Sequence, residues 1–343
     1  LRETVKVGMG DNRRGLSPAA AMSNFRLTPN ALGHKLKLHQ LQIFERVLER
    51  RSLSRAANEL NLTQPSVTKA IYELEKFVGA PLFERSNRGV VPTELAHLLG
   101  RRVKTLMAEL RYMTDELNAA LTGESGHVII GTLIAASAKL LPEAISMLMR
   151  EHPGIRVTVS EGPSSQLFPA LATGDLDIVV GRLPERDIAL GYAYPLTHHT
   201  LYEEKLHAVV GAHHPLARAE NLELGQLMEL PWILPSAESP LRSAVEQTFH
   251  RTGLGIPPRH IESLSLLTNL GILLRGEAIA LMPQDAAAQF LDHGLLKLLP
   301  LAEFGLFGRV GYSVRANRQL TPASQHLIEY LHRICDTRNA AAS

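Results

Sequence analysis

Apolar residues recur every three or four positions along four segments near the start of the chain, which is the spacing of one helix face. This pattern predicts helices over 36–48, 53–60, 64–77 and 93–121. Ser52 and Thr63 stand directly before the second and third segments and suit N-caps. Only Asn61 and Leu62 separate those two helices, so a tight turn must join them. Two short helices joined in this way indicate a helix-turn-helix.

The third segment, 64–77, has one apolar stripe and an opposite face of polar and charged residues. The stripe consists of Val67, Ala70, Ile71 and Leu74. The N-terminal residues of such a helix can reach base edges in the major groove, while the preceding helix crosses the phosphates. Gln64 can bridge N6 and N7 of adenine, and Ser66 can serve several base edges. We therefore expect this helix to read DNA.

Two short apolar runs follow, Leu82 to Arg85 and Val90-Val91, on either side of a turn of Asn, Arg and Gly. They predict a hairpin, and a hairpin beside a helix-turn-helix is a wing. Arg85 and Arg88 then suit the minor groove or its phosphates. The plainer interpretation is a generic three-helix module with a surface hairpin. The residues that we expect at DNA are Arg50, Arg51, Ser54, Arg55, Thr63, Gln64, Pro65, Ser66, Lys69, Arg85 and Arg88.

The charge balance changes along the chain. The whole sequence has 36 Lys and Arg against 34 Asp and Glu, a net charge of +2. Residues 1–92 carry 15 basic and 8 acidic residues, a balance of +7, which leaves 21 against 26, a balance of −5, for the remainder. A basic front and a mildly acidic back favour an anion-binding module joined to a different domain, although a solvated basic face gives the same count.

The fourth helical segment, 93–121, has a much narrower apolar stripe, with charged residues on both flanks. Its apolar residues alternate at spacings of three and four, which is the a/d seam of a coiled coil. We expect a dimerisation helix rather than a helix buried on its own domain, because a dimer reads two half-sites in register. The seam residues are Leu99, Val103, Leu106, Leu110, Met113 and Leu117.

From residue 126 onward, short apolar runs alternate with helical patterns. The runs predict strands at 127–131, 155–160, 176–180, 206–210, 232–234, 260–262, 278–282, 296–299 and 309–314. The helical patterns lie at 140–151, 166–173, 241–252, 264–274 and 321–335. This alternation indicates parallel βαβ units, and the length available allows two open α/β units.

Small polar turns follow several of the predicted parallel strands, at the edge where open α/β sheets bind ligands. Hydroxyls and helix N-terminal amides at such an edge suit a carboxylate or another anion. Serine is also a common helix cap, and for any single serine we favour the cap. The residues that we expect at an effector are Ala136, Ser137, Pro163, Ser164, Ser165, Ser236, Glu238, Ser239, Ser263 and Ser265.

Several runs of this sequence resemble the LysR-type transcriptional regulators. The similarity in the DNA-binding domain covers most of 38–98 and includes Arg55-Ala56-Ala57, Leu62-Thr63-Gln64-Pro65-Ser66 and Gly79-Ala80-Pro81-Leu82-Phe83. Lys69 departs from the family, which often has a small or other polar residue there, so the base preference at this position stays open. Gly174-Asp175-Leu176-Asp177-Ile178 and His213-His214-Pro215-Leu216 are similar to the family's effector domains. The run from Gly174 to Arg182 is similar to a subgroup that regulates protocatechuate catabolism and sugar-binding-protein genes.

The resemblance implies an α/β protein with an N-terminal winged helix-turn-helix, a long linker helix and a periplasmic-binding-protein-like effector domain of two subdomains. It implies dimers, paired into homotetramers, that bind promoter double-stranded DNA and contact RNA polymerase. A small-molecule inducer would bind between the subdomains, and the subgroup points to an aromatic acid or a sugar derivative. The expected domains are a flexible tail at 1–33, the DNA-binding domain at 34–92, the coiled-coil linker at 93–122 and the effector domain at 126–335, with subdomains at 126–204 plus 304–335 and at 205–303.

The sequence argues against an enzyme, a metal site and a membrane protein. It contains no GxSxG, HExxH, P-loop or GxGxxG motif. The single Cys335 excludes a disulfide scaffold, and the adjacent histidines at 198–199 and 213–214 point to opposite faces of a strand. No apolar run reaches the roughly 18 residues that span a bilayer, and no signal peptide is visible. We expect a cytoplasmic regulator without cofactors; a ligand-independent repressor or nucleoid protein and a solute-binding protein are the alternatives.

Overall fold

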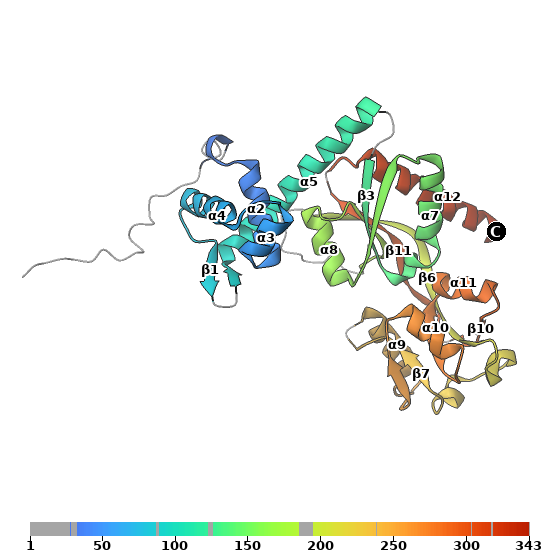
Figure 1. The fold of residues 1–343 in the computed structure, drawn as a ribbon. Coiled ribbons are helices and arrows are strands. Elements are labelled where there is room, and N and C mark those ends of the chain that lie inside the picture. The colour runs from blue at the N-terminus through green and yellow to red at the C-terminus, as the bar shows by residue number, and fades with distance from the viewer. Residues whose placement is uncertain are drawn as a thin grey trace, which may run out of the picture. The chain divides into compact units, whose positions relative to one another are not determined.

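The computed structural model divides the chain into two units, residues 1–103 and residues 104–343 (Figure 1). Each unit is described by itself. The residues whose structure is described are 28, 33–86, 89–122, 126–184, 195–237, 239–302, 304–316 and 318–342. The predicted tail at 1–33 lies almost entirely outside them.

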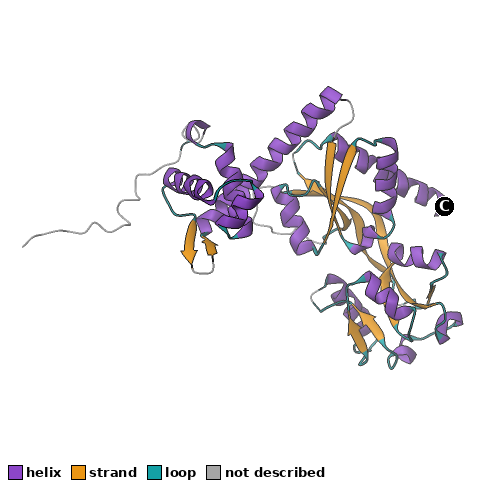
Figure 2. Ribbon diagram, in the orientation of Figure 1, coloured by secondary structure: helices purple, strands orange, loops and turns teal. Residues whose placement is uncertain are grey.

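The first unit is a three-helix core with a hairpin beside it (Figure 2). Its elements are α2 (Leu38–Arg50), α3 (Leu53–Glu59), α4 (Gln64–Val78), β1 (Phe83–Ser86) and β2 (Gly89–Pro92). The two strands pair antiparallel, and the ring of Phe83 lies 5.6 Å from that of Phe44, centroid to centroid. This contact fixes the hairpin to α2, because both rings are removed from water. The predicted helix-turn-helix and wing are both confirmed.

Helix α5 (Glu94–Thr122) is one continuous helix of 29 residues that begins in the first unit and continues into the second. The Thr93 hydroxyl accepts a hydrogen bond from the Ala96 amide at 3.2 Å, which caps its first turn. Gly100 allows a close approach to α2, since a Cβ at this position would lie 2.3 Å from Leu48 Cδ2. The start of α5 is therefore packed on the three-helix core.

The second unit contains two groups of parallel strands. In the first, β3 (Gly126–Thr132) pairs parallel with β4 (Ile155–Glu161) and with β5 (Ile178–Arg182). Its helices are α6 (Ile134–Ser137), α7 (Leu140–Glu151), α8 (Ser164–Thr173) and α12 (Pro322–Ala342). Apolar residues of β3, β5, α7 and α12 form a common core, and Figure 1 shows α7 and α12 on the same side of β3.

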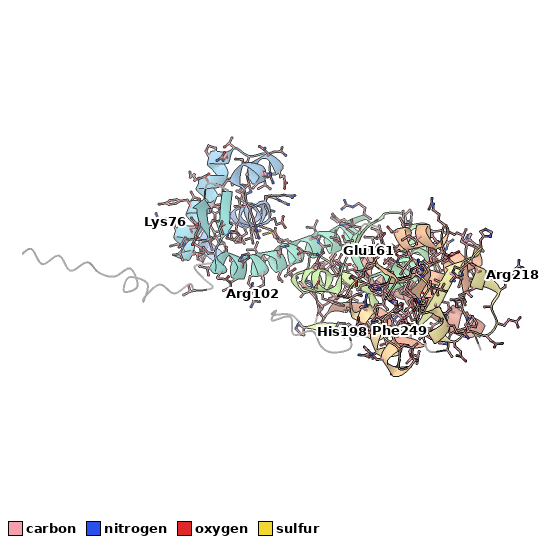
Figure 3. The ribbon with its side chains drawn as sticks, turned by 90° about the horizontal axis from the view of Figure 1, so that it is seen from below. Lys76, Arg102, Glu161, His198, Arg218 and Phe249 are labelled. Atoms are coloured by element: carbon pink, nitrogen blue, oxygen red, sulfur yellow. The ribbon has the colours of Figure 1, made fainter. Side chains whose placement is uncertain are left out.

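In the second group, β7 (Trp232–Leu234) pairs parallel with β8 (His260–Glu262) and with β9 (Ile279–Pro283). In the core of this group, the ring centroids of Phe249 and Trp232 lie 5.5 Å apart. Figure 3 shows Phe249 inside this part of the chain and Arg218 at its surface. The other elements are the 3-10 helices η1 (Pro215–Arg218) and η2 (Leu224–Leu227), helices α9 (Pro240–Arg251), α10 (Leu266–Leu273) and α11 (Gln284–Asp292), and strand β10 (Leu296–Leu298).

Two long antiparallel strands, β6 (Leu196–Gly211) and β11 (Leu306–Arg315), join the two groups in the order β4-β3-β5-β11-β6-β9-β7-β8, with β10 beside β6. The first part of β6, up to Lys205, pairs with β11. From Leu206 onward, β6 pairs with β9 and β10 instead. The same strand therefore belongs to both halves of the effector domain.

Three local expectations differ from the structure. The strand predicted at 206–210 is only the end of β6, which begins at Leu196. The residues from Thr197 to Lys205 are mostly polar, and their strand is held by the ladder to β11 rather than by an apolar run. Ala135-Ala136-Ser137, expected as a turn, belongs to the short helix α6, and α11 was not predicted at all.

Candidate DNA-binding face, dimer helix and effector site

Helix α4 has one face in the core and one face in solvent. Its four predicted stripe residues are all buried, which confirms the sequence pattern. The opposite face forms a shallow open surface over Gln64, Pro65, Thr68, Lys69 and Tyr72. The Lys69 side chain is 77% exposed, and its ammonium lies 4.0 Å from the Glu73 carboxylate. A helix held in this way presents its first turns to a groove of DNA.

Hydrogen bonds at the start of α4 orient the polar residues there. The Ser54 hydroxyl donates to Gln64 Oε1 at 3.0 Å, so the amide nitrogen of Gln64 is the end left to seek an acceptor. The Thr63 hydroxyl accepts from the Ser66 amide at 3.4 Å and lies 2.8 Å from the Ser66 hydroxyl. Thr63 therefore caps the helix through the Ser66 amide, and Pro65 lies in its first turn.

The predicted phosphate-binding arginines have different surroundings. Arg50 is paired with Glu59 at 2.6 Å, whereas Arg55 is exposed in the first turn of α3. Arg51 adopts a left-handed conformation after α2 with a φ of 48°, and its carbonyl accepts from the Val90 amide at 3.2 Å. The backbone of Arg51 thus supports the wing.

The wing is also attached to the recognition helix. Glu75 Oε1 of α4 accepts hydrogen bonds from the amides of Leu82 and Phe83, at 2.8 and 3.1 Å. Gly89 has a φ of +123°, and a Cβ there would lie 2.8 Å from the Arg51 carbonyl oxygen. In β1 the backbone of Arg85 pairs with Val90. The Arg85 side chain and all of Arg88 lie outside the described part of the chain.

Sequence reasoning missed two residues of the exposed α4 face. Thr68 and Tyr72 follow Gln64 at steps of four, so all three lie along one line of the helix. The Tyr72 side chain is 63% exposed, which is unusual for so large an aromatic residue. The steps of four from Gln64 are visible in the sequence.

The predicted seam of α5 divides into a buried part and an exposed part. Val103 is only 2% exposed within the chain itself, and Leu99 and Leu110 are half-buried. The remaining three seam residues, Leu106, Met113 and Leu117, are 40%, 52% and 56% exposed. They lie within a narrow sector of the helix, because steps of seven and four return to nearly the same face. This exposed line of Leu106, Met113 and Leu117 is called the α5 stripe below.

Four of the seven serines predicted at an effector make local hydrogen bonds, and two of these four cap helices. Ser239 accepts from the Leu241 amide at 3.2 Å at the start of α9. Ser265 accepts from the Thr268 amide at 3.3 Å at the start of α10, and Ser263 accepts from the Ser265 amide at 3.2 Å. Ser137 donates to the Ile134 carbonyl at 3.2 Å. These serines therefore make the local cap and turn bonds that the sequence favoured. Whether any of them also contacts an effector stays a prediction.

For the other predicted effector residues that the structure describes, no such hydrogen bond is found among the described residues. Ser164, half-buried, and Ser165, exposed, open α8 after Pro163, whose side chain makes no cap bond. Ala136 is fully buried in the core, and Ser236 is half-buried after β7. Glu238 lies outside the described residues. All of these positions follow the carboxyl ends of parallel strands, in two separate groups.

Charged groups collect where β6 passes from one group of strands to the other. Glu204 is 2% exposed, and neither carboxylate oxygen has a hydrogen-bond partner among the described residues. Burial raises its pKa to about 7, against the attraction of Arg182 and with the repulsion of Asp285. Asp285, at the start of α11, accepts from Tyr202 and Arg338, each at 2.8 Å. These bonds tie α11 to β6 and α12.

Within the described residues, no group of three His, Cys, Asp or Glu side chains is arranged to hold a metal ion. The adjacent histidine pairs are engaged separately, since His198 lies 2.7 Å from the Ser313 hydroxyl and His214 lies 3.0 Å from the Glu277 carbonyl. Burial raises the pKa of the Cys335 thiol to about 11. In the described part of the chain, no helix has the length and apolar content to cross a membrane.

The winged helix-turn-helix and the two-part α/β domain define a DNA-binding transcriptional regulator with an effector domain. Residues 38–97 match the helix-turn-helix of bacterial regulatory proteins of the lysR family, and residues 122–336 match the LysR substrate binding domain. The chain belongs to the LysR family of transcriptional regulators.

Two named regulators are similar to the chain in sequence, and one solved structure is similar to it in fold. The chain is 32% identical to the HTH-type transcriptional regulator GbpR of Azospirillum brasilense, over 89% of this chain and 88% of that protein. It is 32% identical to the regulator PcaQ of Agrobacterium fabrum, over 83% and 90%. Its fold is similar to that of full-length CbnR solved with its target DNA, at 18% identity, a TM-score of 0.63 and coverage of 87% and 99%.

Proposed function

We propose that the chain is a promoter-binding, homo-oligomeric regulator whose activity is switched by a small inducer held between the two halves of the effector domain. The observation that carries the proposal is the solvent-facing side of α4, where Gln64, Lys69 and Tyr72 are presented by a helix that the core and wing hold fixed. Dimers supply two such helices, and two dimers form a tetramer. Such a protein acts in the cytoplasm, where promoter DNA and RNA polymerase are present.

Three sets of residues have separate roles in this proposal. Gln64, Ser66 and Lys69 contact bases, whereas Thr63 and Pro65 shape the start of the helix. Arg50, Arg51, Ser54, Arg55, Arg85 and Arg88 lie toward the phosphates. The α5 stripe supports dimerisation, since it is a row of apolar side chains left in solvent by one chain alone.

The inducer is proposed to be an aromatic acid or a sugar derivative. Supporting this site, the starts of α8, α9 and α10 each follow the carboxyl end of a parallel strand, where helix amides and serine hydroxyls favour polar ligands. Movement of the two halves on such a ligand changes the DNA bend and the contact with RNA polymerase.

The test begins with DNA selected from a random pool by the full-length protein. We expect the selected fragments to share two half-sites a whole number of helical turns apart, protected together in a footprint. Aromatic acids and sugars are then added to the complex, and one class should change the footprint or the bend. Fragments without a common sequence would contradict promoter reading. A footprint that none of the compounds changes would favour the ligand-independent repressor.

A further inference from the structure

Helix α5 carries a second, polar face in the effector unit, on the side opposite the α5 stripe. Lys104, Ala108, Arg111 and Asp115 follow one another at steps of three or four, about half a turn from Leu106 and Met113. Ala108 is 5% exposed and neighbouring Tyr112 is 8% exposed, in contrast to the stripe. The structure itself therefore covers one side of the helix and leaves the other in solvent.

The polar face of α5 converges on Asp177, whose side chain is 2% exposed at the start of β5. Arg111 donates to both carboxylate oxygens, from Nη2 to Oδ1 at 2.8 Å and from Nη1 to Oδ2 at 3.1 Å. The Tyr112 hydroxyl also donates to Oδ1. On its other side, Asp177 Oδ2 accepts from the Ile129 amide of β3 at 2.7 Å. One carboxylate thus links the linker helix to the sheet.

Flanking groups strengthen this junction. Arg315, at the end of β11, donates to the Tyr112 hydroxyl, and its guanidinium lies 5.1 Å from the Tyr112 ring centroid. Lys104 pairs with Asp175 at 2.7 Å. Gly174 permits the close approach, since a Cβ there would lie 2.5 Å from the Ala108 Cβ. Burial is the main cause of the raised pKa of Tyr112, so its hydroxyl stays a donor at neutral pH.

The junction is polar and not fully paired, unlike the apolar cores around it. Arg315 Nη1 and Asp115 Oδ2 are buried without a hydrogen-bond partner among the described residues. A cavity of about 10 Å³ beside Tyr112 and Asp177 has room for about one water molecule. Bidentate pairing fixes the position and direction of a helix, whereas unpaired buried groups limit how tightly it is held. The combination suits a junction that sets an orientation.

We propose that Asp177 is the positioning residue that fixes the dimerisation helix to the effector domain. Through Arg111 and Tyr112 it makes residues 104–118 of α5 move with β3 and β5, and it sets the direction in which the α5 stripe faces. When an inducer moves the half of the effector domain that contains β3 and β5, the contact at Asp177 then turns α5 with it and so changes the dimer. The proposal rests on dimerisation through α5, as proposed above.

The experiment measures the distance between α5 and α7 in the full-length protein. Spin labels are placed at the exposed positions Glu116 and Arg150 in a Cys335→Ala background, and labelled protein is mixed with a large excess of unlabelled protein so that only distances within one chain are recorded. The test variant is Arg111→Met with Tyr112→Phe, which removes the bonds from α5 to Asp177 and leaves the bond between Asp177 and the Ile129 amide of the sheet. Asp177→Ala is avoided, because it removes that bond.

We expect one narrow distance distribution for the wild type and the loss of that single narrow peak in the double variant. Arg111→Lys combined with Tyr112→Phe keeps the charge at position 111 and should restore most of the narrow peak. Arg102→Met is the control, and its distance distribution should match that of the wild type. Arg102 is also an exposed arginine of α5, and its side chain projects from the helix in Figure 3. An unchanged narrow peak in the double variant would overturn the role of Asp177.

Sedimentation of the same samples separates this inference from the proposed dimer. Double-variant protein that stays dimeric but loses the narrow peak supports the positioning role, because a general folding defect would also disturb assembly. If the wild type sediments as a monomer, dimerisation through α5 is wrong, whereas the distance distribution still decides whether Asp177 positions the helix.

Discussion

The DNA-binding half and the effector half of this chain place their candidate sites in different ways. In the first, Gln64, Lys69 and Tyr72 lie on a single helix within nine positions of sequence. In the second, the candidate residues follow strands that are more than 100 positions apart, such as β3 and β8. A site on one helix is set by local periodicity, whereas a site between strand ends is set by the topology of the sheet.

The two halves also show two different roles for a small polar residue near the start of a helix. At the start of α4, the Ser54 to Gln64 bond orients a side chain toward solvent. At the starts of α9 and α10, Ser239 and Ser265 are engaged by their own helix amides. A serine in front of a helix therefore needs a second observation before it is assigned to a ligand.

The largest expected effect concerns the helix that belongs to both halves. Leu106→Lys places a charge in the α5 stripe, and a buried, unpaired charge at a dimer seam costs several kcal/mol. We expect monomers in sedimentation velocity and weak DNA binding, with normal folding because Leu106 is 40% exposed in the single chain.

Leu298→Lys is the matched control, since Leu298 of β10 is 45% exposed and lies outside α5. It should leave the oligomer intact. Oligomers of normal size in Leu106→Lys would mean that the α/β domains suffice for assembly, and the two halves would then be independent of α5.

A smaller effect is expected from Glu204 in the effector half. An unfolded glutamate deprotonates near 4.5 and the folded Glu204 near 7, so between these values the folded state holds the extra proton. The free energy of unfolding therefore falls as pH rises through this window, and above it Glu204 causes no further change with pH. The full loss is about 3 kcal/mol from 1.36 kcal/mol per pKa unit.

Glu204→Gln removes this loss, because the amide does not titrate. The measurement is denaturant unfolding of both proteins from about pH 5 to about pH 8. We expect the variant to gain stability relative to the wild type as pH rises. Parallel pH profiles would show that Glu204 is not an uncompensated buried acid.

The smallest effect tests whether the serines of the effector half are caps. Ser239→Ala removes the bond to the Leu241 amide and should lower the free energy of unfolding by about 1 kcal/mol. Ser164→Ala should leave stability nearly unchanged, because no hydrogen bond of its hydroxyl is found within the described residues. If Ser164→Ala alone weakens inducer binding in calorimetry, Ser164 contacts the ligand and Ser239 is a cap. Equal effects of both variants on stability would contradict this distinction.

Much of the fold follows from local pattern. The helices of the DNA-binding half follow from their apolar spacing, helped by the caps Ser52 and Thr63, and the structure confirms them at α2, α3, α4 and α5. The first part of β6 could not be predicted, because Thr197 to Lys205 gain their strand from β11, which lies about 110 positions later. Helix α11 was missed because Ala286, Ala287 and Ala288 follow one another in it and mark no clear apolar stripe, not because it is short, since α3 is shorter.

The candidate sites also differ in how far the sequence predicts them, because one depends on local pattern and the other on distant segments. The exposed face of α4 follows from knowing which face is buried, and Tyr72 was within reach of that argument. The junction at Asp177 was not, since its partners come from α5, β3 and β11, and Asp175 and Asp177 alone suggest only a turn and a cap. Only the folded chain brings these four segments together.

The most direct test of the central claim, that α4 reads DNA for a ligand-controlled regulator, is the specificity of Gln64→Ala. Its affinity for a selected DNA fragment is compared with its affinity for unrelated DNA at one salt concentration. We expect the specific-to-nonspecific ratio to fall by about tenfold or more, since one good side-chain contact to a base contributes 1–3 kcal/mol of discrimination. Gln42→Ala, an exposed glutamine of α2, should leave it unchanged. A Gln64→Ala protein with the wild-type ratio would contradict the account.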